Sequence, residues 1–428
     1  MRKLFLAIKN DILLYAMLML GFVLRLFYIF IFTTPKLYLW SDPGAYDLRA
    51  LQMAKGIHMM FSTYWPPFYH IWLSLIYRPL IWLGLENWRI EIYVVISALL
   101  AMVGFWCVYQ IVKKLFPAPA GKSQKTALIV LALLILWYPL IYLNYLVMSE
   151  NLFFPLLFLG LYFLITKPQN SSTGLWIGLF FGLAFLTRPI FALVLPLFLL
   201  WGLYYKINWR LLITFTLTAA AIVASMALFN FYYTNGAEKS ISSNGGVGFA
   251  MLWCDAKSLQ FSNNGYSFGF GPPANIDYPE NSRIFTAVPF ENQKYYYQIG
   301  LNCLKNHPQQ LINNFSSIIK LFHSHLFPTI GNIAGWETFR LIFKLLTGLL
   351  FIFSILTTIG LSGKRLKINE SDKKYFYFMA LIIFSVPLTV YLQNIGEERY
   401  LMPYAPLLII LSIPAASALI KKIWKLFQ

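Results

Sequence analysis

The sequence predicts an all-α polytopic membrane protein with about ten transmembrane helices, interfacial helices in the first outer loop, and one long outer loop. Three observations support this fold class. Of the 428 residues, 59% are hydrophobic and only 12% are charged, whereas soluble domains carry about 25% charged residues. Apolar runs of the roughly 20 residues needed to cross a bilayer recur along the chain. Aromatic residues make up 18% of the chain and gather near the ends of these runs, as in interfacial belts.

The first apolar run, 12–32, is too long for the core of a signal peptide, and no small-residue cleavage site follows it. We therefore expect it to be the first span. The polar segment 33–88 comes next and forms the first outer loop. Within it, 67–85 is apolar but interrupted by Arg78 and Pro79, which predicts a helix lying at the interface.

Nine further spans are predicted from the remaining apolar runs. They lie at about 90–112, 126–144, 151–166, 173–187, 189–205, 211–231, 341–360, 375–393 and 403–420. The chain thus divides into an N-terminal transmembrane module (1–231), a long outer loop (232–340) rich in Asn, Gly, Tyr and Pro, and a C-terminal transmembrane module (341–428).

The distribution of charge orients these spans. With the N-terminus inside, the inner segments carry 18 of the 34 basic and 3 of the 16 acidic residues, a net charge of +15 against +3 for the rest. The positive-inside rule then predicts cytoplasmic termini and an outer loop facing the periplasm or exterior of a cytoplasmic membrane. Two spans are predicted around Arg188-Pro189, because a single span would place the basic cluster at 364–374 outside. The net charge of +18 fits this bias and contact with anionic membrane lipids, not a nucleic acid partner.

Under this topology most acidic residues lie on the outer face. If Pro43 starts a helix, Asp42, Tyr46 and Arg49 share one helix face at i, i+4 and i+7. A carboxylate, a phenol and a guanidinium would then point the same way. Asp before Pro is also a good N-cap, which is the structural alternative for Asp42. Asp47 is expected to be a solvated partner of a nearby base.

Other polar residues lie at or inside the predicted spans. Arg25 falls in the first span, where a charge costs about 2.5–3.5 kcal/mol on insertion scales; a buried ion pair is expected, and snorkelling is the alternative. Glu150 closes the second outer loop and can cap the next helix, pair with Arg25, or face a substrate. Glu398 and Arg399 lie in the last outer loop, where boundary charges are usually solvated.

The cysteines and short motifs exclude several kinds of site. Cys254 and Cys303 both fall in the long outer loop, where oxidation permits a disulfide; two free thiols are the alternative. No CxxC or Cys/His cluster indicates zinc, and His323 and His325 are two residues apart and share no helix face. No nucleotide-binding glycine motif is present, and no clear inverted repeat indicates a transporter.

Four segments, in this order along the chain, resemble segments of the GT-C membrane glycosyltransferases, in the branch of protein O-mannosyltransferases and lipid A aminoarabinose transferases. They are Leu24-Arg25 leading into Asp42, Tyr46, Gly56 and Pro66-Pro67-Phe68-Tyr69; Met148-Ser149-Glu150-Asn151-Leu152-Phe153; Gly178-Leu179 and Gly182-Leu183-Ala184-Phe185-Leu186-Thr187-Arg188-Pro189; and Glu398-Arg399-Tyr400-Leu401-Met402-Pro403. The long outer loop before the last spans also matches. The resemblance covers most of the chain and depends on the order of the motifs, not on any one of them.

This resemblance implies an active site on the outer face, at the first loop, and a sugar donor linked to polyprenyl phosphate. It gives Asp42 the role of general base, which takes a proton from the attacking acceptor. Cations are needed at the leaving phosphate, and guanidinium groups fit phosphate oxygens. The substrate- and phosphate-binding candidates are Tyr46, Arg49, Glu150, Arg188, Glu398, Arg399 and Tyr400.

The sequence departs from the family pattern at two positions. Many relatives have a second acidic residue directly after the catalytic Asp, but here it is Pro43, which weakens any metal role. Relatives often carry Lys before the Pro-Pro pair and use it to bind phosphate, but here it is Trp65, so phosphate binding must depend on other residues. Because Pro43 weakens the metal role, we expect no cofactor. The implied reaction is an inverting transfer of a sugar to a lipid, glycan or protein. The alternatives are a transporter or flippase of lipid-linked sugar, a ligase that moves a whole glycan, and a non-catalytic scaffold.

Overall fold

The computed structural model describes residues 2–39, 41–57, 65–117, 122–233, 235–236, 241–242, 244–256, 258–263, 266–270, 283–286, 288, 292–316, 318, 336–363, 368–393 and 398–426. Within these ranges most residues are helical, as predicted. The α-helices of the N-terminal part are α1 (Arg2–Phe27), α2 (Ser41–Ala54), α3 (Pro67–Trp82), α4 (Arg89–Leu115), α5 (Lys122–Ile135), α6 (Tyr138–Tyr145), α7 (Glu150–Thr166), α8 (Ser171–Thr187), α9 (Val194–Tyr204) and α10 (Trp209–Tyr233). Those that follow are α11 (Asn244–Trp253), α12 (Gln293–Asn306), α13 (Gln310–Asn313), α15 (Trp336–Ser362), α16 (Glu370–Gln393) and α17 (Ala405–Leu426).

Each of the ten predicted spans coincides with an apolar helix or helix pair. Six helical segments are long and apolar enough to cross a membrane by themselves, and the pair formed by α5 and α6, bent by 52°, makes a seventh when taken as one span. The helices α7, α8 and α9 are apolar but have at most 17 residues. At about 1.5 Å per residue they are shorter than a bilayer core of about 30 Å. A multi-pass membrane protein is therefore confirmed, while the count of ten spans is not.

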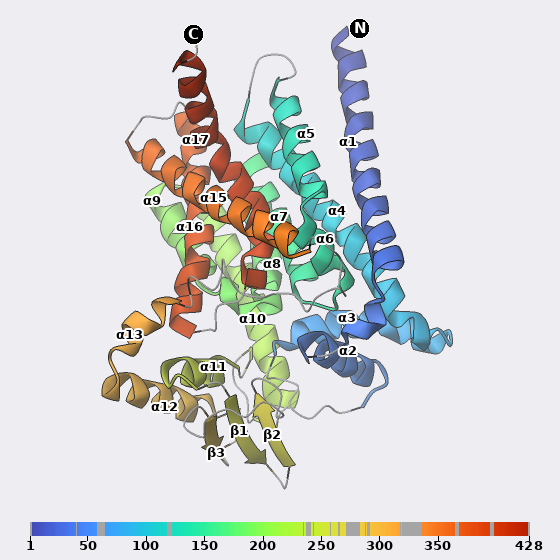
Figure 1. The fold of residues 1–428 in the computed structure, drawn as a ribbon, viewed down its shortest axis with the longest axis vertical. Coiled ribbons are helices and arrows are strands. Elements are labelled where there is room, and N and C mark those ends of the chain that lie inside the picture. The colour runs from blue at the N-terminus through green and yellow to red at the C-terminus, as the bar shows by residue number, and fades with distance from the viewer. Residues whose placement is uncertain are drawn as a thin grey trace.

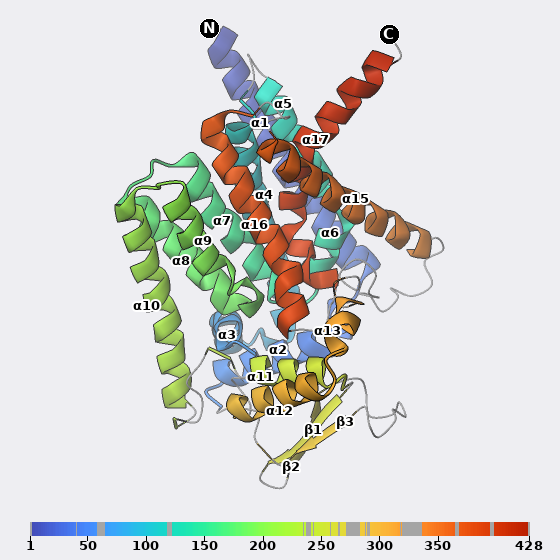
Figure 2. The same cartoon turned by 90° about the vertical axis from the view of Figure 1, so that its left-hand side faces the viewer.

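The segment around Arg188-Pro189 forms a hairpin, as the charge rule predicts. The helix α8 ends at Thr187, a 3₁₀ turn covers Pro189–Phe191, and α9 follows. The chain then returns to the end where α8 began. The side-chain amide of Asn208, after α9, donates there to the carbonyl of Gln169, just before α8, at 2.9 Å. Figure 2 shows α8, α9 and α10 side by side at one edge of the bundle. This hairpin places Arg188 at the tip of two helices.

Small residues hold α8 close to α10. Three glycines four residues apart, Gly174, Gly178 and Gly182, lie against α10. A methyl group at Gly178 would come 2.6 Å from the backbone oxygen of Phe215, too close for any side chain to fit. Small residues at this spacing allow membrane helices to approach closely. The packing fixes the direction of α8, and with it the position of Arg188.

The long loop is the part where the prediction of an all-α chain is incomplete. Besides α11, α12 and α13 it contains the strands β1 (Ser258–Asn263), β2 (Tyr266–Phe270) and β3 (Arg283–Thr286). They form one sheet in the order β2-β1-β3, antiparallel between β1 and β2 and parallel between β1 and β3. The predicted disulfide is present, since Cys254 and Cys303 are bonded with Cα atoms 5.1 Å apart. It fastens the end of α11 to α12.

The two termini lie at one end of the molecule, and the helices α11 and α12 and the three strands of the long loop lie at the other (Figure 1). The helices α2 and α3 of the first outer loop are at the same end as α11 and α12. This arrangement agrees with the predicted sidedness of the loops relative to one another. The helix ends at Tyr233 and Trp336 lie close to the predicted edges of the long loop. The division into three parts stays a prediction.

Arg25 is fully buried in α1, but its partners differ from the expected carboxylate. Its Nε donates to the side-chain oxygen of Asn144 at 2.8 Å, and Nη1 donates to the carbonyl oxygens of Gly21 and Ile135. Asn144 in turn donates to Asn151 at 3.0 Å. Among the described residues Arg25 thus has hydrogen bonds in place of the predicted ion pair. These acceptors engage two of the three guanidinium nitrogens, and the buried Nη2 has no hydrogen-bond partner among the described residues. The network ties α1 to α6 and α7.

Candidate active site

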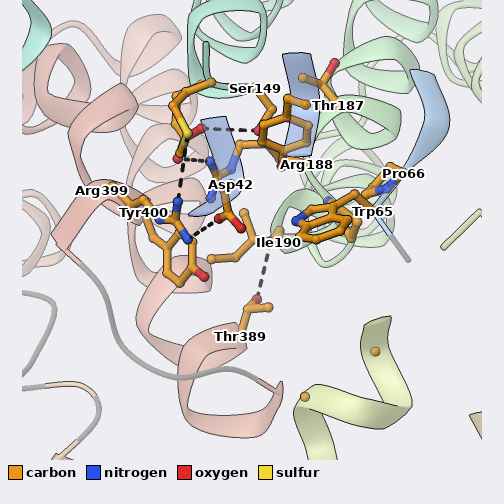
Figure 3. Close-up of a pocket in the computed structure, with 16 residues that line it drawn as sticks. Asp42, Trp65, Pro66, Ser149, Thr187, Arg188, Ile190, Thr389, Arg399 and Tyr400 are labelled. Carbon is orange, nitrogen blue, oxygen red and sulfur yellow. Dashed lines mark hydrogen bonds and ion pairs between the residues drawn. The ribbon is translucent and has the colours of Figure 1, made fainter. Parts of the chain in front are cut away.

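One cavity, of about 170 Å³, lies where the first outer loop meets the helix bundle and the long loop (Figure 3). Segments that are far apart in the sequence form its walls. The lining residues are Asp42, Tyr46, Trp65, Pro66, Met148, Ser149, Glu150, Thr187, Arg188, Pro189, Ile190, Gly245, Gly248, Thr389, Arg399 and Tyr400. Two carboxylates and two guanidinium groups therefore face one small space, as expected of a site that binds a charged ligand.

Asp42 enters the cavity from the first turn of α2. The start of the helix lies close to the preceding chain. A methyl group at Gly44 would therefore lie only 2.5 Å from the carbonyl oxygen of Leu39. The carboxylate of Asp42 pairs with the guanidinium of Arg399 at 2.7 Å. The side chain retains 21% of its exposure. Because α2 begins at Ser41, before Pro43, Asp42 is its second residue and the predicted N-cap position is wrong. Asp42 is instead a partly exposed carboxylate in contact with a cation.

Glu150 and Arg188 form a second ion pair in the same cavity. Glu150 is the first residue of α7, where the helix dipole favours a negative charge. Arg188 follows the last residue of α8. The side chain of Glu150 is completely buried and that of Arg188 is 10% exposed, and Ser149 donates a further hydrogen bond to Glu150 at 3.2 Å. Three roles were considered for Glu150: capping the next helix, pairing with Arg25, and facing a substrate. In the structure Glu150 lines the cavity, and it pairs with Arg188 instead of Arg25.

Tyr400 lies against both cavity arginines. The Arg188 guanidinium is 5.0 Å from the centre of the Tyr400 ring, and the Arg399 guanidinium is 5.5 Å from it. A cation this close to an aromatic face is attracted by the ring quadrupole. The ring therefore helps to hold two like charges in one cavity.

Tyr46 and Arg49 occupy different places although they share a face of α2. Tyr46 lines the cavity, and burial, followed by the charge of Asp42, raises the pKa of its phenol well above the usual value. Arg49 does not line the cavity. It stacks on Trp65, with its guanidinium carbon 4.0 Å from the ring centre.

His70 is a very weak base near neutral pH. Burial, and then the charge of Arg49, lowers the pKa of its imidazole to about 3.

Asp47 differs from its prediction. It does pair with a base, but it is buried instead of solvated, with 5% of its surface exposed. Arg89 at the start of α4 holds it in a two-pronged contact, at 2.9 and 2.7 Å. A bidentate pair of this kind is strong and directional. Sequence periodicity did not show that α4 covers this face of α2.

The sequence prediction and the cavity agree on six side chains. These are Asp42, Tyr46, Glu150, Arg188, Arg399 and Tyr400. The side chain of Glu398 lies outside the described residues. Trp65, Ser149, Thr187 and Thr389 also line the cavity but were not predicted as site residues. Ser149 and Thr187 adjoin predicted residues and could have been found that way, whereas nothing in the sequence marks Thr389.

A metal site is not visible in the described part of the chain. No group of three or more His, Cys, Asp or Glu side chains there is arranged to hold a metal ion. The expectation that no cofactor is needed stays a prediction.

Comparison with known proteins supports the resemblance seen in the sequence. The model of the family described as dolichyl-phosphate-mannose-protein mannosyltransferase matches residues 72–233. The match confirms a likeness to GT-C membrane glycosyltransferases over this range, which includes Glu150 and Arg188 but neither Asp42 nor Arg399. No curated protein sequence matches the chain.

Two solved structures are similar to the chain in the path of their backbone. One is the oligosaccharyltransferase AglB of Archaeoglobus fulgidus in complex with an inhibitory peptide and a dolichol-phosphate. It has a TM-score of 0.49 and 13% identity, and the likeness covers 97% of this chain and 51% of that one. The other is an Archaeoglobus fulgidus oligosaccharyltransferase in complex with zinc and sulfate, with a TM-score of 0.41, 14% identity, and 95% and 49% coverage. The chain spans about half the length of these structures.

Proposed function

We propose that this protein is a membrane glycosyltransferase that moves a sugar from a polyprenyl-phosphate donor to an acceptor. The observation that carries the proposal is the cavity in which Asp42, Arg188 and Arg399 converge from three distant segments. The family match supports glycosyl transfer, and the description of the matched family as dolichyl-phosphate-dependent supports a polyprenyl-phosphate donor. The acceptor is a lipid, a glycan or a protein.

The proposed reaction is a single displacement at the anomeric carbon. A hydroxyl or amine of the acceptor attacks this carbon, and its proton passes to the carboxylate of Asp42. The new bond joins the acceptor to the sugar. The bond between the sugar and the phosphate oxygen breaks, and its electron pair stays on the lipid phosphate. Configuration at the anomeric carbon is inverted, because no enzyme nucleophile takes part.

The charges of the cavity suit this assignment. Asp42 is accessible, whereas Glu150 is buried against Arg188, so Asp42 is the carboxylate that an acceptor can reach. A general base must lie within hydrogen-bond distance of the proton it removes. Tyr46 keeps its proton, because its pKa is raised, and His70 is too weak a base. The two guanidinium groups stand near Asp42 to stabilise the negative charge that develops on the leaving phosphate.

We place the cavity on the outer face of a cytoplasmic membrane, with both termini inside. The charge difference of +15 against +3 supports this orientation. Single-cysteine labelling of intact cells at Asn263 and at Gln428 tests it. Reaction at Asn263 alone is expected, and labelling of Gln428 from outside would overturn the orientation.

Donor use is tested with purified protein and a panel of polyprenyl-phosphate sugars. Release of lipid phosphate together with formation of a glycosylated acceptor is the expected result. Movement of a lipid-linked sugar across liposomes without release of lipid phosphate would instead identify a flippase.

A further inference from the structure

The two ion pairs of the cavity differ in how easily they can open. The side chains of Glu150 and Arg188 are 0% and 10% exposed, whereas those of Asp42 and Arg399 are 21% and 18% exposed. Separating a buried pair leaves an uncompensated charge and is strongly unfavourable. A partly exposed pair loses less, because water or a bound ligand replaces the lost partner. The Asp42–Arg399 pair is therefore the one that an incoming ligand can break.

Arg399 also has contacts that keep it in the cavity when it leaves Asp42. Its guanidinium lies against the ring of Tyr400, 5.5 Å from the ring centre. Its Nη1 lies 4.0 Å from the sulfur of Met148. Arg188 reaches the same ring at 5.0 Å and is held by Glu150. A phosphate bound beside Tyr400 would therefore meet Arg188 in a fixed position and Arg399 as a cation that can move between two partners.

The contact with Arg399 also opposes base catalysis by Asp42. The carboxylate oxygen of Asp42 that contacts Arg399 is 2.7 Å away, so the guanidinium occupies a position that an acceptor hydroxyl would need. For an acceptor hydroxyl to reach this oxygen, Arg399 has to withdraw.

We propose that Arg399 is a switch operated by the donor: the phosphate of the lipid-linked sugar takes the guanidinium from Asp42 and thereby frees the base. The inference rests on the proposed function. Donor binding then precedes productive binding of the acceptor. After transfer, Arg399 stays paired with the lipid phosphate. When the lipid phosphate leaves the cavity, Arg399 pairs with Asp42 again. The exchange keeps the base covered while no donor is present.

Binding of a sugar-free polyprenyl phosphate, which is the product of the proposed reaction, tests the switch without any turnover. The affinity is measured in detergent for the wild type, Asp42→Asn, Arg399→Gln and the double variant. In the wild type the lipid phosphate competes with Asp42 for Arg399. Asp42→Asn should therefore bind it about tenfold more tightly, because contacting residues are commonly coupled by amounts of this order. Arg399→Gln should weaken binding, and the gain from Asp42→Asn should vanish in the double variant.

The matched control is Asp255→Asn, since Asp255 is exposed, is not among the cavity-lining residues, and has a positive φ that Asn also adopts readily. It should leave the affinity unchanged. Arg399→Met replaces Arg399→Gln if the latter does not fold as judged by its melting temperature. A short-chain phosphatidylglycerol should not compete, and competition would make the cavity a general site for phospholipid headgroups and overturn the proposal.

The remaining outcomes separate this inference from the proposed function. No gain from Asp42→Asn, or an equal gain with and without Arg399, refutes the exchange and leaves the proposed function standing. Failure of the wild type to bind any polyprenyl phosphate removes both.

Discussion

Removing one charge of the buried pair tests how the cavity is built. In Glu150→Gln, Arg188 keeps its charge but loses the carboxylate that compensates it within a nearly closed environment. Breaking a buried pair from one side costs about 3–5 kcal/mol. The entropy of unfolding is about 2.1 cal/mol/K per residue near 60 °C, or about 0.9 kcal/mol/K for 428 residues. The melting temperature should therefore fall by about 3–6 °C.

Thermal unfolding of the purified variants in detergent measures this effect. The control is Glu86→Gln, because Glu86 pairs with Lys55 at the surface with 34% of its side chain exposed. A surface pair contributes about 0–1 kcal/mol, so the control should shift the melting temperature by no more than about 1 °C. The double variant, in which both Glu150 and Arg188 are changed to Gln, should lose less stability than the sum of the losses in Glu150→Gln and in Arg188→Gln. A Glu150→Gln variant that melts with the wild type would refute the reasoning.

Two further predictions concern the framework around the cavity. Gly178→Leu should abolish the folded protein, because the new side chain overlaps the backbone of α10, while Gly348→Leu should be tolerated, because a methyl group there meets nothing within 4 Å; recovery of monodisperse protein after size-exclusion chromatography compares them, and equal yields would contradict the packing. The disulfide between Cys254 and Cys303 closes a separation of 49 residues, which is worth about 4 kcal/mol in the chain-entropy model. Reductant should therefore lower the melting temperature of the wild type but not that of a variant with both residues changed to Ser, and an insensitive wild type would refute this contribution.

The sequence was sufficient to predict the chemistry of the cavity but not its pairings. Asp42, Glu150, Arg188 and Arg399 were all predicted as site residues, because the segments that contain them resemble segments of the GT-C glycosyltransferases. Which carboxylate meets which guanidinium depends on how α2, α7 and α8 pack, and no local pattern contains that information. The pairing of Glu150 with Arg188 was therefore not predicted.

Tertiary coverage explains the other differences. Asp47 has the pattern of a solvated residue, yet the start of α4 covers it and supplies Arg89. Arg25 was expected to need a carboxylate, but its Nε and Nη1 donate to Asn144 and to backbone carbonyls instead. The small sheet was missed although the sequence carries a signal for part of it. Apolar residues alternate along Ser258–Asn263 and along Tyr266–Phe270, and Asn264-Gly265, a dipeptide that favours hairpins, separates the two runs in the sequence.

The catalytic assignment of Asp42 is the central claim, and Asp42→Asn tests it most directly. Asp42 is the second residue of α2 and its structural contact is the partly exposed pair with Arg399. Such a pair contributes about 0–1 kcal/mol, so a purely structural Asp42 should tolerate the change. Asn accepts no proton, and general base catalysis is typically worth about 10²–10⁴-fold. Sugar transfer by purified Asp42→Asn should therefore fall at least about a hundredfold, at unchanged melting temperature, while Asp255→Asn keeps the wild-type rate. Transfer by Asp42→Asn within a few-fold of the wild type, at equal amounts of folded protein, would contradict the account and leave Asp42 as a structural residue.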